Sequence, residues 1–159
     1  MASARVKKSS ETGSSNLFVL ERFVPYRLSI LSNRVSRAIA KRYAKTFGLT
    51  VPEWRVIAVL GHSPGLTAKD IAEATEMDKV AVSRAVARLV SARRVAAEID
   101  TSDARRQRLR LTAQGESVHT RIAPMALAAE RRLLAALSAR EVAQLDALLD
   151  RLLSAAKGL

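Results

Sequence analysis

The chain has 159 residues, which suits one domain or one small domain with additional helices. Lys and Arg number 27 against 15 Asp and Glu, and the formal net charge of +12 favours a polyanionic partner, usually nucleic acid; the alternative is a basic protein with no such partner. The absence of cysteine excludes disulfides and thiol-based redox sensing, and with only two histidines, far apart, we expect no metal site.

Residues 1–16 are polar and rich in serine, which predicts a disordered basic tail. No hydrophobic core of a signal peptide follows, and no apolar run approaches the roughly 18 residues needed to span a membrane. We therefore expect a cytoplasmic protein with no membrane partner. Residues 1–47 hold ten basic and two acidic side chains, so the excess charge does not by itself locate a DNA-reading segment.

Two helices are predicted in the first third of the chain. Apolar residues recur at helical spacing from about residue 17, with Pro25 in the first turn and Gly48 as the stop after Phe47. Thr50 then caps a second helix, whose apolar face includes Trp54. The sequence HSPG that follows is predicted to end it.

The next two predicted helices carry a DNA-reading pattern. Thr67 and Asp70 form a capping box for a short helix, and Asp78 caps a second helix from Lys79 to about Ala92. The predicted buried stripe of this second helix is Val82, Val86, Leu89 and Val90. Its other side carries Ser, Arg and small residues, as in a helix-turn-helix, whose second helix can lie in the major groove. There an arginine such as Arg84 can form a bidentate pair with guanine.

A β-hairpin is predicted directly after this pair of helices. Residues 95–99 and 107–111 read as strands around a turn, which places Arg105 and Arg106 near the tip. In this position the hairpin is a candidate wing, whose arginines can enter a minor groove or bind phosphates. The alternative is an ordinary basic hairpin in which Arg105 pairs with Asp103. The residues predicted to contact DNA are Thr67, Lys69, Lys79, Ser83, Arg84, Arg88, Arg105, Arg106 and Arg108.

Helices resume after the hairpin. Thr112 caps one that runs to about Leu137, and Ser138 with Glu141 caps the last, residues 139–156. The helices at both chain ends have apolar faces with little local core to cover, which predicts burial against a second copy in a homodimer. The predicted fold is mainly α: a winged helix-turn-helix DNA-binding domain over 48–112 with a small β-hairpin wing, flanked by dimerisation helices over 17–47 and 113–159.

This order of elements resembles the MarR family, the multiple-antibiotic-resistance regulators. The strongest match is to the family's wing pattern, carried by Asp103, Arg105, Leu111, Thr112 and Gly115. The stretch LTAKDIAEATEMDKVAVSRAVARLV is similar to the family's helix-turn-helix. Two departures are Arg93, where members usually have a glycine that often needs positive φ, and Ala97, where an arginine is common.

The resemblance implies a dimer on a palindromic double-stranded DNA operator, usually a repressor released by a small ligand. In such proteins the effector pocket lies between the dimer helices and the winged core, and the candidates here are Tyr26, Arg27, Arg34 and Trp54. A cation beside aromatic rings suits an anionic aromatic compound, such as a phenolic acid or its acyl-coenzyme A thioester. The alternative is that the aromatic residues are core and Arg27 is solvated. No cofactor is expected.

Two other classes of function are weighed against this interpretation. An enzyme is not expected, because no nucleophile and base converge and neither a phosphate loop nor metal-ligand spacing is found. A nonspecific nucleic-acid-binding or architectural protein could use the same basic surface. An RNA reader usually presents aromatic stacking platforms, for which three Phe, two Tyr and one Trp offer few candidates.

Overall fold

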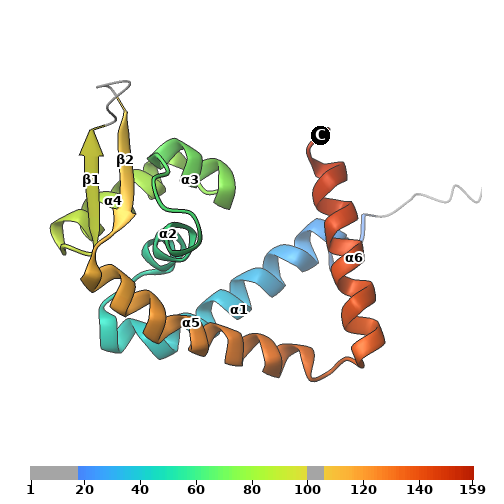
Figure 1. Cartoon of the computed structure of the whole chain (residues 1–159). Helices are drawn as coiled ribbons and strands as arrows, with labels where there is room; N and C mark the ends of the chain where they lie inside the picture. Colours follow the sequence, from blue (N-terminus) through green and yellow to red (C-terminus); the bar gives the residue numbers. More distant parts are fainter. Residues whose placement is uncertain (1–17, 100–105) are drawn as a thin grey trace, which may run out of the picture. The chain divides into compact units, whose positions relative to one another are not determined.

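The computed structural model describes residues 18–99 and 106–159 (Figure 1). The helices and strands are η1 (a 3-10 turn, Leu20–Arg22), α1 (Val24–Phe47), α2 (Val51–His62), α3 (Ala68–Thr75), α4 (Lys79–Ser91), β1 (Val95–Ile99), β2 (Gln107–Leu111), α5 (Ala113–Leu134) and α6 (Ala139–Ala156). The predicted fold class, mainly α with one hairpin, is confirmed. The predicted tail over 1–16 and the hairpin tip with Arg105 lie outside the described residues.

The chain divides between Asn33 and Arg34 into two units. The described part of the first, residues 18–33, holds η1 and the beginning of α1, and the rings of Phe18 and Phe23 meet edge to face at 5.1 Å between centroids. All the other elements belong to the second unit. No helix in residues 18–99 and 106–159 is long and apolar enough to cross a membrane.

Capping side chains start the helices where the sequence predicted. Thr50, Thr67 and Ser138 each form a full capping box with the acidic residue three positions later. Asp78 and Thr112 each accept one backbone N–H at the starts of α4 and α5. Because these bonds satisfy donors that a helix leaves unpaired at its first turn, they fix the starts of these five helices locally.

The second unit has one hydrophobic core, which joins the end of α1 to α2, α3, α4, the hairpin and the first half of α5. Its largest fully buried side chains are Tyr43, Ile57, Leu60, Ile71, Leu89, Leu109, Ile122, Val56 and Val82. Within α4 the predicted stripe was wrong at Val90, which is 38% exposed, whereas Ala85 is buried. Successive helix residues are about 100° apart, so Val90 lies well off the line through Val82, Ala85 and Leu89.

The hairpin is antiparallel, with Val95 opposite Leu111 and Ile99 opposite Gln107. Figure 1 shows it standing beside α4. It is also tied to the loop before α3, because the Gly65 N–H donates to the Leu109 carbonyl (2.8 Å) and the Leu109 N–H donates to the Leu66 carbonyl (2.9 Å). The middle of β2 is therefore fixed to this loop.

A tight junction joins the end of α4 to the start of α5. The Thr112 hydroxyl donates to the Arg93 carbonyl (2.7 Å), and the Thr112 N–H donates to the Arg94 carbonyl (3.1 Å). Gly115 packs so closely here that a Cβ on it would lie 2.0 Å from the Arg94 carbonyl oxygen. Three residues of the pattern on which the family resemblance rests therefore pack this junction: Leu111, Thr112 and Gly115.

Arg93 has φ of 54°, as expected for a position that the family usually fills with glycine. A left-handed conformation costs a residue with a Cβ about 1–2 kcal/mol, while glycine loses roughly 0.5–1 kcal/mol more backbone entropy on folding. We therefore expect Arg93→Gly to raise the free energy of unfolding by about 0.5–1 kcal/mol. Denaturant unfolding at one protein concentration measures it. Ala92→Gly is the control, since φ is −80° there and glycine should only lower stability; a loss of stability in Arg93→Gly would contradict the argument.

Candidate nucleic-acid interface

Helix α4 presents one continuous face away from its buried stripe. Val82, Ala85 and Leu89 are buried in the core. The exposed residues at helical spacing on the opposite side are Val80, Ser83, Arg84, Ala87 and Ser91. The face combines small side chains, which allow close approach of a helix backbone, with a single arginine that can reach further.

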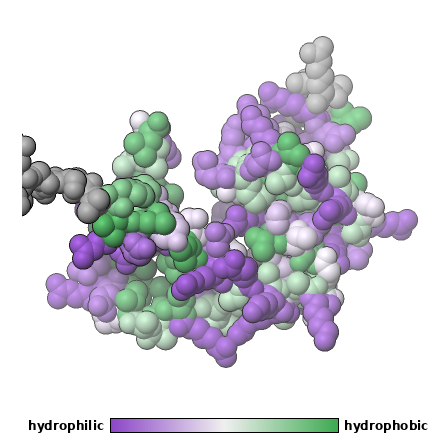
Figure 2. All heavy atoms as spheres, turned by 180° about the vertical axis from the view of Figure 1, so that it is seen from behind, coloured by the Kyte–Doolittle hydropathy of each residue, from purple (hydrophilic) through white to green (hydrophobic). Residues whose placement is uncertain are grey.

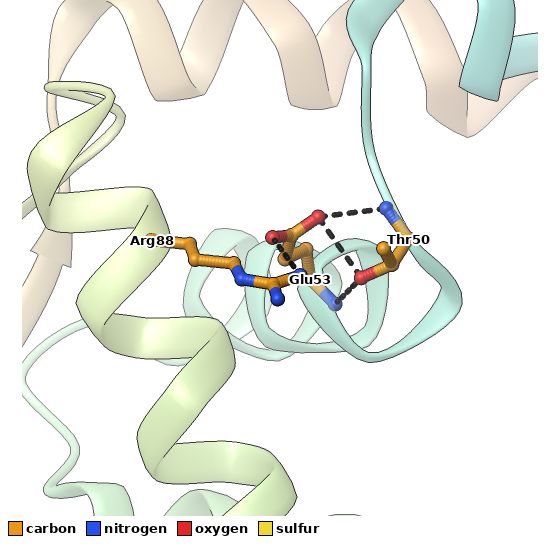
Figure 3. Close-up of polar contacts among 3 residues, drawn as sticks. All are labelled: Thr50, Glu53 and Arg88. Atoms are coloured by element: carbon orange, nitrogen blue, oxygen red, sulfur yellow. Dashed lines mark hydrogen bonds and ion pairs between the residues drawn. The ribbon is translucent and has the colours of Figure 1, made fainter.

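Arg84 and Arg88, both predicted to contact DNA, differ in their surroundings. Arg84 is exposed and has no ion pair within residues 18–99 and 106–159. The Arg88 guanidinium lies 3.8 Å, Nη1 to Oε1, from the carboxylate of Glu53 on α2 (Figure 3). Arg88 therefore occupies the flank of α4 that faces α2, and its DNA contact stays a prediction.

Glu53, in the first turn of α2, is the buried carboxylate that faces Arg88. Its side chain is 7% exposed, and Oε2 accepts hydrogen bonds from the Thr50 N–H (2.7 Å) and hydroxyl (2.9 Å), which leaves Oε1 toward Arg88 (Figure 3). The Thr-Val-Pro-Glu spacing is a capping-box pattern and could have identified the cap. The pairing with Arg88 has no local signal in the sequence.

The residues predicted at the start of α3 and α4 are also placed. Thr67 is used as a cap, since its hydroxyl accepts from the Asp70 N–H (3.2 Å). Lys69 forms an exposed ion pair with Glu73 one turn later (3.7 Å), and Lys79 is exposed in the first turn of α4. The bonds from Thr67 hold the pKa of Asp70 below its usual value, and the positive charges of Arg106 and Lys69 lower it further.

The arginines of the wing that the structure describes lie at the surface. Arg106 and Arg108 are both exposed, and Arg108 Nη1 donates to the Gly65 carbonyl at 3.0 Å. Arg110 pairs with Glu98 on the neighbouring strand. Arg108 therefore braces the hairpin against the loop before α3, and a phosphate contact by it would have to coexist with that bond.

A groove of about 550 Å³ separates α4 from the hairpin. It is lined by Ala68, Ser83, Val86, Ala87, Val90, Ser91, Ala97, Gln107 and Leu109. Small residues dominate it, and Ala97 stands where an arginine is common in the family that the sequence resembles. The groove is thus open beside the exposed face of α4.

The four predicted ligand-binding residues fall in two units. Tyr26 and Arg27 belong to residues 18–33, whereas Arg34 and Trp54 belong to the second unit. Trp54 is half-buried and stacks on His119, with 6.0 Å between ring centroids. Arg34 lines a groove between α1 and α5 that Trp54 does not line. A pocket shared by all four stays a prediction.

Tyr43 continues this aromatic row, 5.9 Å from Trp54 between ring centroids. Its side chain is fully buried, and its hydroxyl has no hydrogen-bond partner within residues 18–99 and 106–159. Burial raises the pKa of Tyr43 to about 12. In residues 18–99 and 106–159, no group of three or more His, Asp or Glu is arranged to hold a metal ion.

Comparison with known proteins assigns this architecture. A MarR family model matches residues 47–106, which run from the end of α1 to the first residue after the hairpin tip. The HTH-type transcriptional repressor Rv2887 of Mycobacterium tuberculosis is 29% identical over 131 residues, 82% of this chain and 91% of that protein. The transcriptional regulator HosA of Escherichia coli is 31% identical over 93 residues, 58% of this chain and 69% of that protein. The chain belongs to the MarR family.

Solved MarR-family structures agree with the fold. A MarR/EmrR family regulator from Acinetobacter sp. ADP1 is similar with a TM-score of 0.81 and 26% identity, over 89% of this chain and 99% of that one. The structure of Rv2887 in complex with salicylic acid is similar with a TM-score of 0.65 and 26% identity, over 82% and 96%. This MarR-family chain is therefore a DNA-binding transcriptional regulator, and the relatives it matches are regulators rather than enzymes.

Proposed function

We propose that this regulator is a homodimeric repressor that binds a palindromic operator and is released by a small anionic aromatic ligand. The observation that carries the proposal is the exposed face of α4, where one arginine stands among small residues beside the wing. In the proposed division of the chain, residues 48–112 bind DNA and residues 17–47 and 113–159 form the dimer.

The proposed DNA contacts fall into two classes. Ser83 and Arg84 on α4 would read base edges in the major groove, because the first turns of a recognition helix lie closest to the bases. The other contacts, which would bind phosphates and set the register without reading sequence, are Thr67, Lys69, Lys79, Arg88, Arg105, Arg106 and Arg108. The α4 residues decide which operator is bound, and the surrounding cations supply most of the affinity.

An equilibrium titration tests the DNA-binding part. The full chain is titrated with a palindromic duplex selected from a random library, with a scrambled duplex of equal length and with a single-stranded RNA, all at one fixed salt concentration. We expect the selected duplex to bind at least 10³-fold more tightly than the other two. Equal affinity for all three would favour the alternative, a nonspecific nucleic-acid-binding or architectural protein.

The proposal of an anionic aromatic ligand is supported by the chemistry of the candidate residues and by the ligand of a relative. Rv2887 has been solved with salicylic acid, an aromatic carboxylate, and the candidate contacts here are the cations Arg27 and Arg34 and the aromatic residues Tyr26 and Trp54. Salicylate added to the protein–operator complex is expected to release the duplex, and benzyl alcohol, which lacks the negative charge, is not. If salicylate does not release the duplex, the proposal of an anionic aromatic ligand is wrong, and the proposal of operator binding is unaffected.

The dimer is supported by the apolar face of α6. The exposed leucines on one stripe of this helix are Leu145, Leu148, Leu149, Leu152 and Leu153. Figure 2 shows apolar residues, in green, at the surface of this helix. Contiguous apolar surface of this kind marks protein interfaces, and a second copy of the same helix would cover it symmetrically.

We expect Leu148→Glu to raise the dissociation constant of the dimer at least tenfold, because the new charge would have to be buried in the interface. Sedimentation equilibrium of the full chain measures it. Ala143→Glu introduces the same charge on the opposite, exposed side of α6 and should leave the dimer intact. Equal behaviour of the two variants would place the interface elsewhere.

A further inference from the structure

Arg94 lies between the end of α4 and the start of β1, and its half-buried side chain binds the end of a distant helix. Arg94 Nη2 donates a hydrogen bond of 2.6 Å to the carbonyl of Phe47, the last residue of α1, although the two residues are 47 positions apart. The last carbonyls of a helix have no partner within the helix, and the negative end of the helix dipole lies there. The guanidinium of Arg94 therefore caps α1 from outside.

The main chain of Arg94 binds two further helices. Its N–H donates to the Leu89 carbonyl of α4 (2.9 Å), and its carbonyl accepts the N–H of Thr112, the N-cap of α5 (3.1 Å). Gly115 packs against the same carbonyl, which leaves that oxygen no room to move toward α5. One residue thus joins the reading helix α4 to the end of α1 and the start of α5, and both of these helices belong to the segments proposed to form the dimer.

The end of α1 is bound by α5 as well. The guanidinium of Arg121 on α5 lies over the buried ring of Phe47, 4.7 Å from the ring centroid. Removing the Arg94 guanidinium would keep this contact between α1 and α5 and would loosen the connection between α1 and α4. Apolar packing would still hold α1 against the core, but such packing is non-directional and fixes an angle less sharply than a hydrogen bond does.

The arginine is an expensive choice at this position. Within residues 18–99 and 106–159, its Nε is buried without a hydrogen-bond partner, and no carboxylate oxygen lies within 4.0 Å of its guanidinium. A buried donor without an acceptor and a charge without a counter-ion both oppose folding. An apolar side chain that fills the same space is often as stable or more stable. This balance favours a role in geometry over a role in stability.

We propose that Arg94 is a positioning residue for operator binding: it fixes the angle between α4 and α1 and so sets the half-site spacing that the dimer accepts. The inference rests on the proposed homodimer on a palindromic operator. In such a dimer the two reading helices enter major grooves about one helical turn, or a multiple of it, apart. A rotation of α4 against α1 would change the separation of the two helices, so a loose connection would admit operators of several spacings.

The test is a set of operators with different half-site spacing, titrated with the full chain at one salt concentration. One base pair inserted at the centre moves a half-site by about 3.4 Å and turns it by about 35°. We expect the wild type to bind the selected operator at least tenfold more tightly than this longer version. In Arg94→Met, whose side chain ends at the position of the arginine Nε, the ratio is expected to fall to threefold or less. Binding to a duplex with a single half-site should stay within twofold of the wild type.

Two further variants separate position from charge. Arg93→Met removes the same charge from the neighbouring residue, whose side chain is exposed, and should keep the wild-type spacing ratio. Arg94→Lys retains a charged donor on a long side chain and should restore most of the ratio. The unfolding midpoint of Arg94→Met in denaturant is expected to be no lower than that of the wild type, because the buried arginine opposes folding.

Each other outcome contradicts a separate step. An undiminished spacing ratio in Arg94→Met, or an equal loss in Arg93→Met, would overturn the positioning role. An Arg94→Met chain that does not fold would show that the arginine is structural and would overturn it too. A wild type that binds the palindrome no more tightly than a scrambled duplex would overturn the proposed operator binding, and this inference with it.

Discussion

Replacing Gly115 by alanine is expected to lower the free energy of unfolding by about 3 kcal/mol, the upper part of the range for overpacking a tight interior. The added Cβ would lie 2.0 Å from the Arg94 carbonyl oxygen and 3.0 Å from its carbonyl carbon. Both atoms are backbone, so no change of rotamer can relieve the overlap. The same carbonyl accepts the Thr112 N–H, so moving it would also strain the junction between α4 and α5.

Denaturant unfolding of the wild type and the variant at one protein concentration measures this effect. Gly158→Ala is the matched control, because the nearest atom to its added Cβ is 3.7 Å away, in ordinary contact. The control should change stability by less than about 0.5 kcal/mol. If the two variants lose the same stability, the junction yields easily and the close approach does not explain the glycine.

Much of the fold was predictable because its signals are local. Each helix start depends on one side chain and a backbone N–H two or three residues later, so Thr50, Thr67, Asp78, Thr112 and Ser138 could be identified as caps from spacing alone. The strands were identified by short runs on either side of a turn signal, and their described bounds agree. These signals also fixed the order of elements from which the family resemblance followed.

What could not be predicted depends on contacts between distant segments. Helical periodicity puts both Arg84 and Arg88 outside the buried stripe of α4, and only the position of α2 shows that one of them meets Glu53. Likewise, α4 offered two similar stripes, and packing against α2 and α3 selected Ala85 rather than Val90.

Arg84→Ala is expected to weaken binding to the operator by about 1–3 kcal/mol and to flatten the base preference at one position in each half-site. The physical reason is that Arg84 projects from the exposed face of α4 without an ion pair among the described residues, so its guanidinium is available to a guanine edge. Titration of the operator and of all its single-base variants at one salt concentration measures both quantities.

Arg88→Ala is the matched comparison, since it removes the same group from a position one turn further along α4. The Arg88 guanidinium is held 3.8 Å from a carboxylate that is itself fixed by two hydrogen bonds from Thr50. Reaching a base would mean leaving Glu53 buried without its cation, which opposes the movement. We therefore expect Arg88→Ala to weaken binding to all sequences by a similar, smaller factor and to leave the base preference intact. The opposite result, with base preference lost in Arg88→Ala and kept in Arg84→Ala, would show that Arg88 leaves Glu53 on DNA and that the reading face of α4 is turned toward α2.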